Sequence, residues 1–161
     1  MNYSYNIASE KNMLKLGQAL ANACMNFAVS KCVIYLQGEL GAGKTTLTRG
    51  FLRALGFAQS VKSPSYTIVE PYVVNNLQVY HFDLYRLSHP EELMYIGARD
   101  YFSERAICLI EWPEHGNGFI PEADIICSLF MDEYSSKKRL VTVVDNSIIG
   151  GSIAQNIMEV W

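Results

Sequence analysis

The feature that most constrains this chain is the stretch at residues 38–45, which fits the phosphate-binding pattern G-x-x-x-x-G-K-[ST]. The residues before it, 32–36, form a short apolar run rich in strand formers, as a buried parallel strand does. The residues after it, 45–55, repeat an apolar side chain every fourth position from Leu47 to Leu55, which gives one apolar face of a helix. The stretch is therefore predicted to lie between a strand and a helix, as this pattern requires.

Such a loop binds phosphate through its backbone. Its glycines let the main chain approach the anion closely, and successive N–H groups and the positive end of the helix dipole point at it. We expect Lys44 to bridge the β- and γ-phosphates of a nucleotide and the Thr45 hydroxyl to ligate Mg²⁺. The residues predicted to bind the nucleotide are Glu39, Leu40, Gly41, Ala42, Gly43, Lys44, Thr45 and Thr46.

Composition limits the class of protein. The chain has 161 residues, half of them apolar and 18% charged, which predicts one globular domain over residues 1–161. The net charge of −3 argues against a protein that grips nucleic acid by bulk electrostatics. Asn2 to Ser9 lacks the apolar core of a signal peptide, and no run approaches the ~20 apolar residues of a membrane span. We therefore expect a cytoplasmic protein with no membrane partner.

The cysteines predict the same compartment. They show no C-x-x-C pairing and no histidine spacing suited to zinc, and each lies in an apolar segment. We expect reduced, buried thiols in a reducing environment.

Hydrophobic spacing and turn residues predict the remaining elements. Helices are expected from the N-cap Ser9 to before Ser30, and then at 90–95, 100–102 and 152–161. Strands are expected at 2–7, 66–74, 77–82, 106–111, 125–130 and 140–144, with a polar turn at 132–139.

Two of these strands end in a carboxylate. The apolar run 106–111 ends at Glu111, which is the form of a Walker B strand whose acid holds Mg²⁺ directly or through water. The strand at 77–82 leads to Asp83, a candidate for positioning Mg²⁺ or water, because ligands of open α/β sheets bind beyond the carboxyl ends of strands. The alternatives are a structural acid at Glu111 and a turn or N-cap residue at Asp83.

Other polar residues carry weaker signals. The loop 61–67 gathers three hydroxyls and a lysine, and it is either a switch that senses the γ-phosphate or an ordinary polar loop. His81 and His89 are expected to pack or to lie at the surface, and Arg86 and Arg99 to be solvated or paired. The basic trio of Lys137, Lys138 and Arg139 is either a solvated face or a contact to nucleotide or an acidic partner.

Four segments together resemble one known family. Residues 38–46, 61–67 (Val-Lys-Ser-Pro-Ser-Tyr-Thr), 81–87 (His-Phe-Asp-Leu-Tyr-Arg-Leu) and 110–114 (Ile-Glu-Trp-Pro-Glu) closely resemble the bacterial TsaE (YjeE) family. These are small ATPases needed for the threonylcarbamoyladenosine modification of tRNA. The resemblance extends from about Glu10 to Glu114, and the last two segments are more specific than the phosphate loop.

The resemblance implies an α/β fold of the P-loop NTPase type, with helices flanking a central, mainly parallel or mixed sheet. It implies that ATP is bound and slowly hydrolysed, and that the protein acts through the TsaD–TsaB heterodimer, touching tRNA only indirectly and not transferring the threonylcarbamoyl group itself. The positions that match family site residues are Thr45 and Glu111 for Mg²⁺, Asp83 for hydrolysis, Trp112 beside the site, Ser63, Ser65 and Thr67 in a switch-like loop, and Glu10 near the nucleotide. Ser65 stands where the family usually has threonine, and it keeps the hydroxyl.

The function expected is thus a Mg²⁺-dependent ATPase with Lys44, Asp83 and Glu111 as its catalytic residues. No obvious arginine finger lies near the phosphate loop, so we expect slow intrinsic turnover that partners raise. One alternative is a binding module gated by ATP, in which hydrolysis is incidental. Another is a small-molecule kinase, although no arginine-bearing lid segment is visible. A GTPase is disfavoured because the chain has no Asn-Lys-x-Asp motif.

Overall fold

A seven-stranded sheet forms the centre of the computed structural model, which describes residues 1–161. The strand order is β1-β7-β6-β2-β5-β4-β3. Strands β6, β2, β5 and β4 run parallel, whereas β7, β1 and β3 pair antiparallel at the two edges. The strands are β1 (Asn2–Ile7), β2 (Cys32–Gln37), β3 (Val69–Val74), β4 (Leu77–Asp83), β5 (Ile107–Glu111), β6 (Ile125–Met131) and β7 (Arg139–Asp145). The prediction of an α/β fold with a mixed sheet is confirmed.

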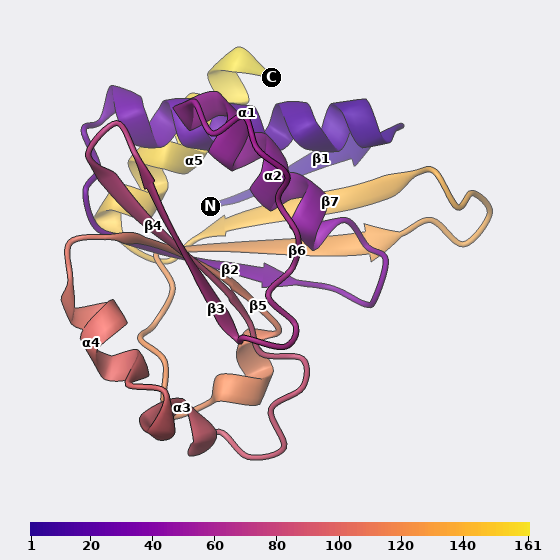
Figure 1. Cartoon of the computed structure of the whole chain (residues 1–161). Coiled ribbons are helices and arrows are strands. Elements are labelled where there is room, and N and C mark those ends of the chain that lie inside the picture. The colour runs from indigo at the N-terminus through magenta and orange to yellow at the C-terminus, as the bar shows by residue number, and fades with distance from the viewer.

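Helices cover both faces of this sheet (Figure 1). One face packs against α1 (Glu10–Asn26), α2 (Lys44–Leu55) and α5 (Ile148–Val160), with a core of 32 buried hydrophobic residues between them. The other face carries α3 (Glu92–Tyr95), α4 (Ala98–Ser103) and the 3₁₀ turn η1 (Pro113–Gly116), with a smaller core of 10 buried hydrophobic residues. The hairpin between β6 and β7 projects beyond the sheet (Figure 1).

Two glycines let α1 and α2 cross in close contact. A Cβ added at Gly17 would lie 2.1 Å from the carbonyl oxygen of Leu47, and one added at Gly50 would lie 2.2 Å from that of Leu14. Real Cβ atoms do not approach so closely, so only glycine permits this crossing. The helix that follows the phosphate loop is thereby held in a fixed position against α1.

Helix ends follow the sequence signals at most positions. The Ser9 hydroxyl accepts a hydrogen bond from the Asn12 N–H at the start of α1, and Gly56 ends α2 in the left-handed conformation with φ of 109°. The prediction for the terminal helix was four residues too short, because α5 begins at Ile148 with Ser147 as its N-cap. Two adjacent glycines in the first turn, Gly150 and Gly151, concealed this start.

The predicted strand at 66–74 is wrong in its first part. Strand β3 begins at Val69, and the residues before it form a turn in which the Ile68 N–H donates to the carbonyl oxygen of Pro64 at 2.8 Å. Ile68 has φ of 70°, a conformation that breaks strand pairing. The loop that was predicted to act as a switch therefore extends to Ile68.

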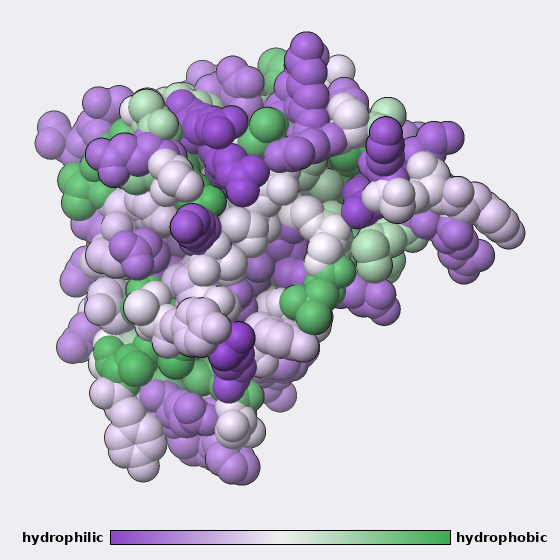
Figure 2. Space-filling view, turned by 45° about the vertical axis from the view of Figure 1, so that its right-hand side comes forward, coloured by the Kyte–Doolittle hydropathy of each residue, from purple (hydrophilic) through white to green (hydrophobic).

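The surface is mostly hydrophilic on the face shown in Figure 2, with apolar side chains in separate patches. All four cysteines are unpaired and buried, as the sequence predicted. None of the helices combines the length and apolar character that a bilayer crossing demands.

Candidate functional site

The site lies at the carboxyl edge of the parallel strands. Asp83 at the end of β4 is the register partner of Glu111 at the end of β5, and Glu111 is also opposite Leu36 at the end of β2. The phosphate loop leaves β2 at this same edge. Parallel strands thus gather two acids and the loop, although they are far apart in sequence.

A cavity of about 420 Å³, the edge cavity, lies where these groups meet. It is lined by Leu40, Gly41, Gly43, Lys44, Thr45, Thr46, Ser63, Ser65, Asp83, Tyr85, Arg86, Glu111 and Trp112. Most of the residues predicted for the site are therefore brought together.

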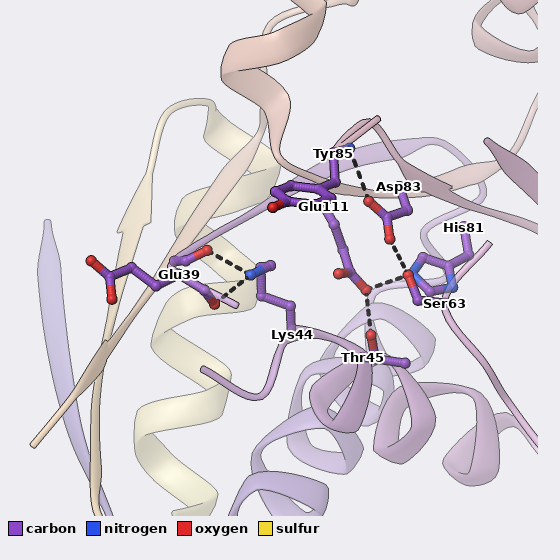
Figure 3. A network of polar contacts seen from close by, with 9 residues as sticks. Glu39, Lys44, Thr45, Ser63, His81, Asp83, Tyr85 and Glu111 are labelled. Atoms are coloured by element: carbon purple, nitrogen blue, oxygen red, sulfur yellow. Dashed lines mark hydrogen bonds and ion pairs between the residues drawn. The ribbon is translucent and has the colours of Figure 1, made fainter. Parts of the chain in front are cut away.

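The carboxylate of Glu111 is held by two donors (Figure 3). The Thr45 hydroxyl donates to its Oε1 at 2.9 Å, and Nε2 of His81 lies 2.8 Å from the same oxygen. Glu111 is 3% exposed and His81 is completely buried, so this contact is shielded from water. Nδ1 of His81 has no hydrogen-bond partner, so Glu111 is the ring's one hydrogen-bond partner.

Lys44 is buried and bonded to its own loop. Its ammonium donates to the carbonyl oxygens of Gly38 at 2.5 Å and Glu39 at 2.8 Å, and it lies 4.3 Å from the centre of the Trp112 ring. Burial lowers the pKa of Lys44, while the nearby carboxylates, Glu111 foremost, act in the opposite direction. Glu39 contributes only its backbone here, because its side chain points away from Lys44 (Figure 3).

Asp83 ties the predicted switch loop to the site. The Ser63 hydroxyl donates to its Oδ2, and the Tyr85 N–H donates to its Oδ1 at 3.0 Å. Ser65 also lines the edge cavity, whereas Thr67 is exposed and does not line it. The structure thus brings two of the three predicted switch residues to the site.

A second cavity of about 560 Å³, the outer cavity, lies on the other side of the phosphate loop. Its lining includes Glu10, Arg49, Thr46, Lys137 and Arg139. Arg49 contacts the Glu10 carboxylate at 3.3 Å, and the Glu10 side chain is still mostly exposed.

The Arg139 side chain forms hydrogen bonds with the phosphate loop. Its guanidinium donates to the carbonyl oxygens of Gly41 at 3.0 Å and Ala42 at 3.2 Å. Lys137 lines the outer cavity beside it, whereas Lys138 lines a different cavity at the β6–β7 hairpin. The basic trio therefore divides: Arg139 contacts the loop, Lys137 faces the outer cavity and Lys138 faces neither cavity at the loop.

The donor set at the edge cavity suits a hard cation such as Mg²⁺. The hydroxyl of Thr45 and the carboxylate of Glu111 are already adjacent, and both are oxygen ligands of the kind that Mg²⁺ prefers. No group of three or more histidine, cysteine, aspartate or glutamate side chains could hold an ion by itself. A magnesium ion here would therefore take its remaining ligands from phosphate oxygens and water.

Strained backbone flanks the same cavity. Trp112 has φ of 56°, immediately after Glu111, and Ile68 closes the switch loop with φ of 70°. Left-handed conformations cost about 1–3 kcal/mol for residues such as these, and they persist where the surroundings enforce them.

Three residues contact the site more directly than the sequence predicted. His81 is buried as a packing residue should be, but it also contacts Glu111. Its signal was the spacing of two from Asp83, which places both side chains on one face of a strand. Two arginines that the sequence did not assign to the site lie near it, because Arg86 lines the edge cavity and Arg139 bonds the loop. For Arg139 the local signal was the basic trio at 137–139, which does not indicate a contact with the phosphate loop.

Comparison with known proteins matches this chain to one family. The family model described as "Threonylcarbamoyl adenosine biosynthesis protein TsaE" matches residues 7–141. A relative from Haemophilus influenzae, named tRNA threonylcarbamoyladenosine biosynthesis protein TsaE, is 45% identical over 148 residues, covering 91% of this chain and 92% of that protein. A Bacillus subtilis relative of the same name is 41% identical over 95 residues, covering 59% of each chain. The crystal structure of Bacillus subtilis YdiB superposes with a TM-score of 0.81 at 24% identity, covering 99% of this chain and 95% of that one.

Proposed function

The chain belongs to the TsaE family, and from this premise we propose that it binds ATP and hydrolyses it slowly with Mg²⁺, in support of the threonylcarbamoyladenosine modification of tRNA. The observation that carries this proposal is the meeting of four groups at one edge cavity: Lys44, Thr45, Asp83 and Glu111. An ammonium, a hydroxyl and two carboxylates beside a phosphate-binding loop are the parts that phosphoryl transfer needs.

The two cavities suggest how ATP lies. The phosphate loop forms the ridge between them, since Gly41, Gly43 and Thr46 line both. We expect the triphosphate to lie along this ridge, with its γ-phosphate in the edge cavity and its nucleoside in the outer cavity near Glu10. On this placement Lys44 leaves the carbonyl oxygens of Gly38 and Glu39 and turns to the β- and γ-phosphates.

The buried acids have separate roles. Thr45 and Glu111 would hold Mg²⁺, which neutralises charge on the β- and γ-phosphate oxygens when bound. Asp83 is held by Ser63 and by the Tyr85 N–H, so its carboxylate is fixed at the edge cavity, where it orients the attacking water. Reaction then depends on positioning and electrostatic stabilisation more than on proton transfer.

The partner is proposed to be the TsaD–TsaB heterodimer, with tRNA reached only through that complex. The net charge of −3 supports this, because a protein that held tRNA directly would need a basic surface. At the mouth of the edge cavity, Leu40 is 60% and Tyr85 40% exposed, so apolar surface is available beside the γ-phosphate position. We place the protein in the cytoplasm, where this modification is expected.

Phosphate release from ATP tests the proposal. It is measured for the chain alone and after addition of TsaD–TsaB and tRNA, and the rate is expected to rise only in the mixture. Lys44→Ala should abolish this activity. Lys31→Ala is the matched control, because Lys31 is exposed and precedes β2 at the opposite end from the loop. Normal hydrolysis by Lys44→Ala in the presence of the partners would refute the assignment.

A nucleotide-gated binding module is the remaining alternative. It is favoured by the contact of Asp83 with Ser63, which gives the site a way to shape a surface loop without any reaction. Glu111→Gln separates the two functions. If this variant binds ATP and partners and still supports the modification, hydrolysis is incidental; if it binds both and the modification stops, hydrolysis is the function.

A further inference from the structure

Arg86 occupies an unusual place at the edge cavity. It lines the cavity together with Lys44, Thr45, Asp83 and Glu111, three residues beyond the end of β4. Apart from Lys44, no other lysine or arginine lines this cavity. Arg86 is therefore the cation outside the phosphate loop that lines the cavity proposed to hold the γ-phosphate.

The guanidinium of Arg86 is not held by an acid. It makes no ion pair and no hydrogen bond, although two carboxylates line the same cavity. Instead it lies over the ring of Tyr66, 4.2 Å from the ring centre. Tyr66 is 82% exposed, so this cation–π contact is a weak, solvent-facing hold.

The loop and the turn after β4 are joined twice. Ser63 donates a hydrogen bond to Asp83, and the Tyr66 ring contacts the Arg86 guanidinium. Each pair therefore links residues 61–68 to residues 83–86. The Asp83 N–H also donates to the carbonyl oxygen of Ile68, the residue with φ of 70°. A displacement of the loop by a ligand would therefore act on Arg86 as well as on Asp83.

We infer that Arg86 is an arginine finger supplied within the chain, which Tyr66 holds aside until the loop at 61–68 moves. This inference rests on the proposed function and adds a catalytic residue to it. When the loop is displaced, the guanidinium turns to the equatorial oxygens of the γ-phosphoryl group. Its planar, permanently charged donors match those oxygens.

The chemistry requires no further reactant. Water attacks the γ-phosphorus, the bond from that phosphorus to the β,γ-bridging oxygen breaks, and its electron pair stays on ADP. One proton of the attacking water remains on the inorganic phosphate and the other passes to solvent. Arg86 exchanges no proton, and it stabilises the negative charge that develops on the transferred group. Holding the guanidinium on Tyr66 contributes to the slow turnover that we propose for the free protein.

The test uses binding as well as turnover. Affinity is measured by calorimetry for ADP with Mg²⁺, and again with aluminium fluoride added, since the planar fluoride complex imitates the transferring phosphoryl group. The wild-type chain is expected to bind the second mixture much more tightly than the first. Arg86→Ala should bind ADP with Mg²⁺ within about threefold of wild type and lose about 100-fold or more of the gain from aluminium fluoride, with a matching fall in kcat.

Two further variants separate the finger from a structural role. Arg99→Ala removes an exposed arginine on α4 and should change neither affinity. Tyr66→Ala frees the guanidinium and should raise the gain from aluminium fluoride about two- to fivefold, whereas Tyr66→Phe keeps the ring and leaves it unchanged. Because Arg86 is exposed, its variants should keep the wild-type melting temperature, and this is checked by circular dichroism.

The outcomes distinguish this inference from the proposed function. If the wild-type chain binds and hydrolyses ATP and Arg86→Ala retains the full gain from aluminium fluoride, the finger is refuted and the ATPase stands. Equal losses for ADP and for the fluoride complex would show a general binding residue and would also refute the finger. If the wild-type chain binds no adenine nucleotide, both fall together.

Discussion

Replacing His81 tests whether a buried contact holds Glu111, the proposed magnesium ligand, in place. In the structure Oε1 of Glu111 accepts from Thr45 and contacts Nε2 of His81 at 2.8 Å. On our proposal the Thr45 hydroxyl turns to Mg²⁺ in the loaded site, so the imidazole becomes the remaining protein donor to this carboxylate. His81→Leu keeps an apolar side chain in the buried position and removes that donor.

The expected loss follows from one hydrogen bond to a charged group. Such a bond contributes about 1.5–3 kcal/mol, and removing a residue that orients a metal ligand typically lowers metal affinity about 10- to 100-fold. His81→Leu should therefore raise the Mg²⁺ concentration that half-saturates ATP binding by about 10- to 100-fold. Affinity for ATP measured in EDTA should stay as in wild type, because the phosphate loop is untouched.

Calorimetry of ATP binding over a Mg²⁺ titration measures both quantities. His81→Gln is the matched variant, since its amide N–H can occupy the place of Nε2, and it should lose less than His81→Leu. His89→Leu is the surface control and should behave as wild type. An unchanged Mg²⁺ midpoint in folded His81→Leu would show that the imidazole does not hold Glu111 for the metal.

Three further outcomes are expected. Gly17→Ala forces a Cβ to within 2.1 Å of the Leu47 carbonyl oxygen and should destabilise the fold by about 1–3 kcal/mol, measured by urea denaturation. In the control Gly151→Ala, the nearest neighbour of the new Cβ is a carboxylate oxygen at 3.1 Å, so this variant should be neutral or stabilised by up to about 1 kcal/mol. Arg139→Gln removes bonds to two loop carbonyls and should weaken ATP binding about 10-fold, measured by calorimetry, while Lys138→Gln should not. Burial raises the pKa of Cys24, Cys108 and Cys127 to about 12, so the folded chain keeps thiol protons that the unfolded chain releases above its pKa of 9.0. The melting temperature should therefore fall as pH rises from 9 toward 12, and a constant melting temperature between pH 8 and pH 10.5 would contradict this.

Much of the fold follows from local sequence. The phosphate loop, the helix after it and the carboxylates at the ends of β4 and β5 each have a pattern of a few neighbouring residues. Such patterns work because backbone geometry repeats every two residues in a strand and every 3.6 in a helix. They failed where local chemistry conflicted with periodicity. At Ile68 an apolar, β-branched residue adopts φ of 70°, and at the start of α5 two glycines weaken the helical signal.

The sequence by itself determined that a phosphate loop lies between a strand and a helix, and that acids close two strands. Only the tertiary structure decided which of these groups meet. The strand order places β5 between β2 and β4, so Glu111 lies beside Thr45 and opposite Asp83. The contacts of His81 with Glu111, of Arg86 with Tyr66 and of Arg139 with Gly41 join residues 20 to 98 positions apart. No local pattern encodes such contacts, because they arise from the packing of the whole sheet rather than from the conformation of any one segment.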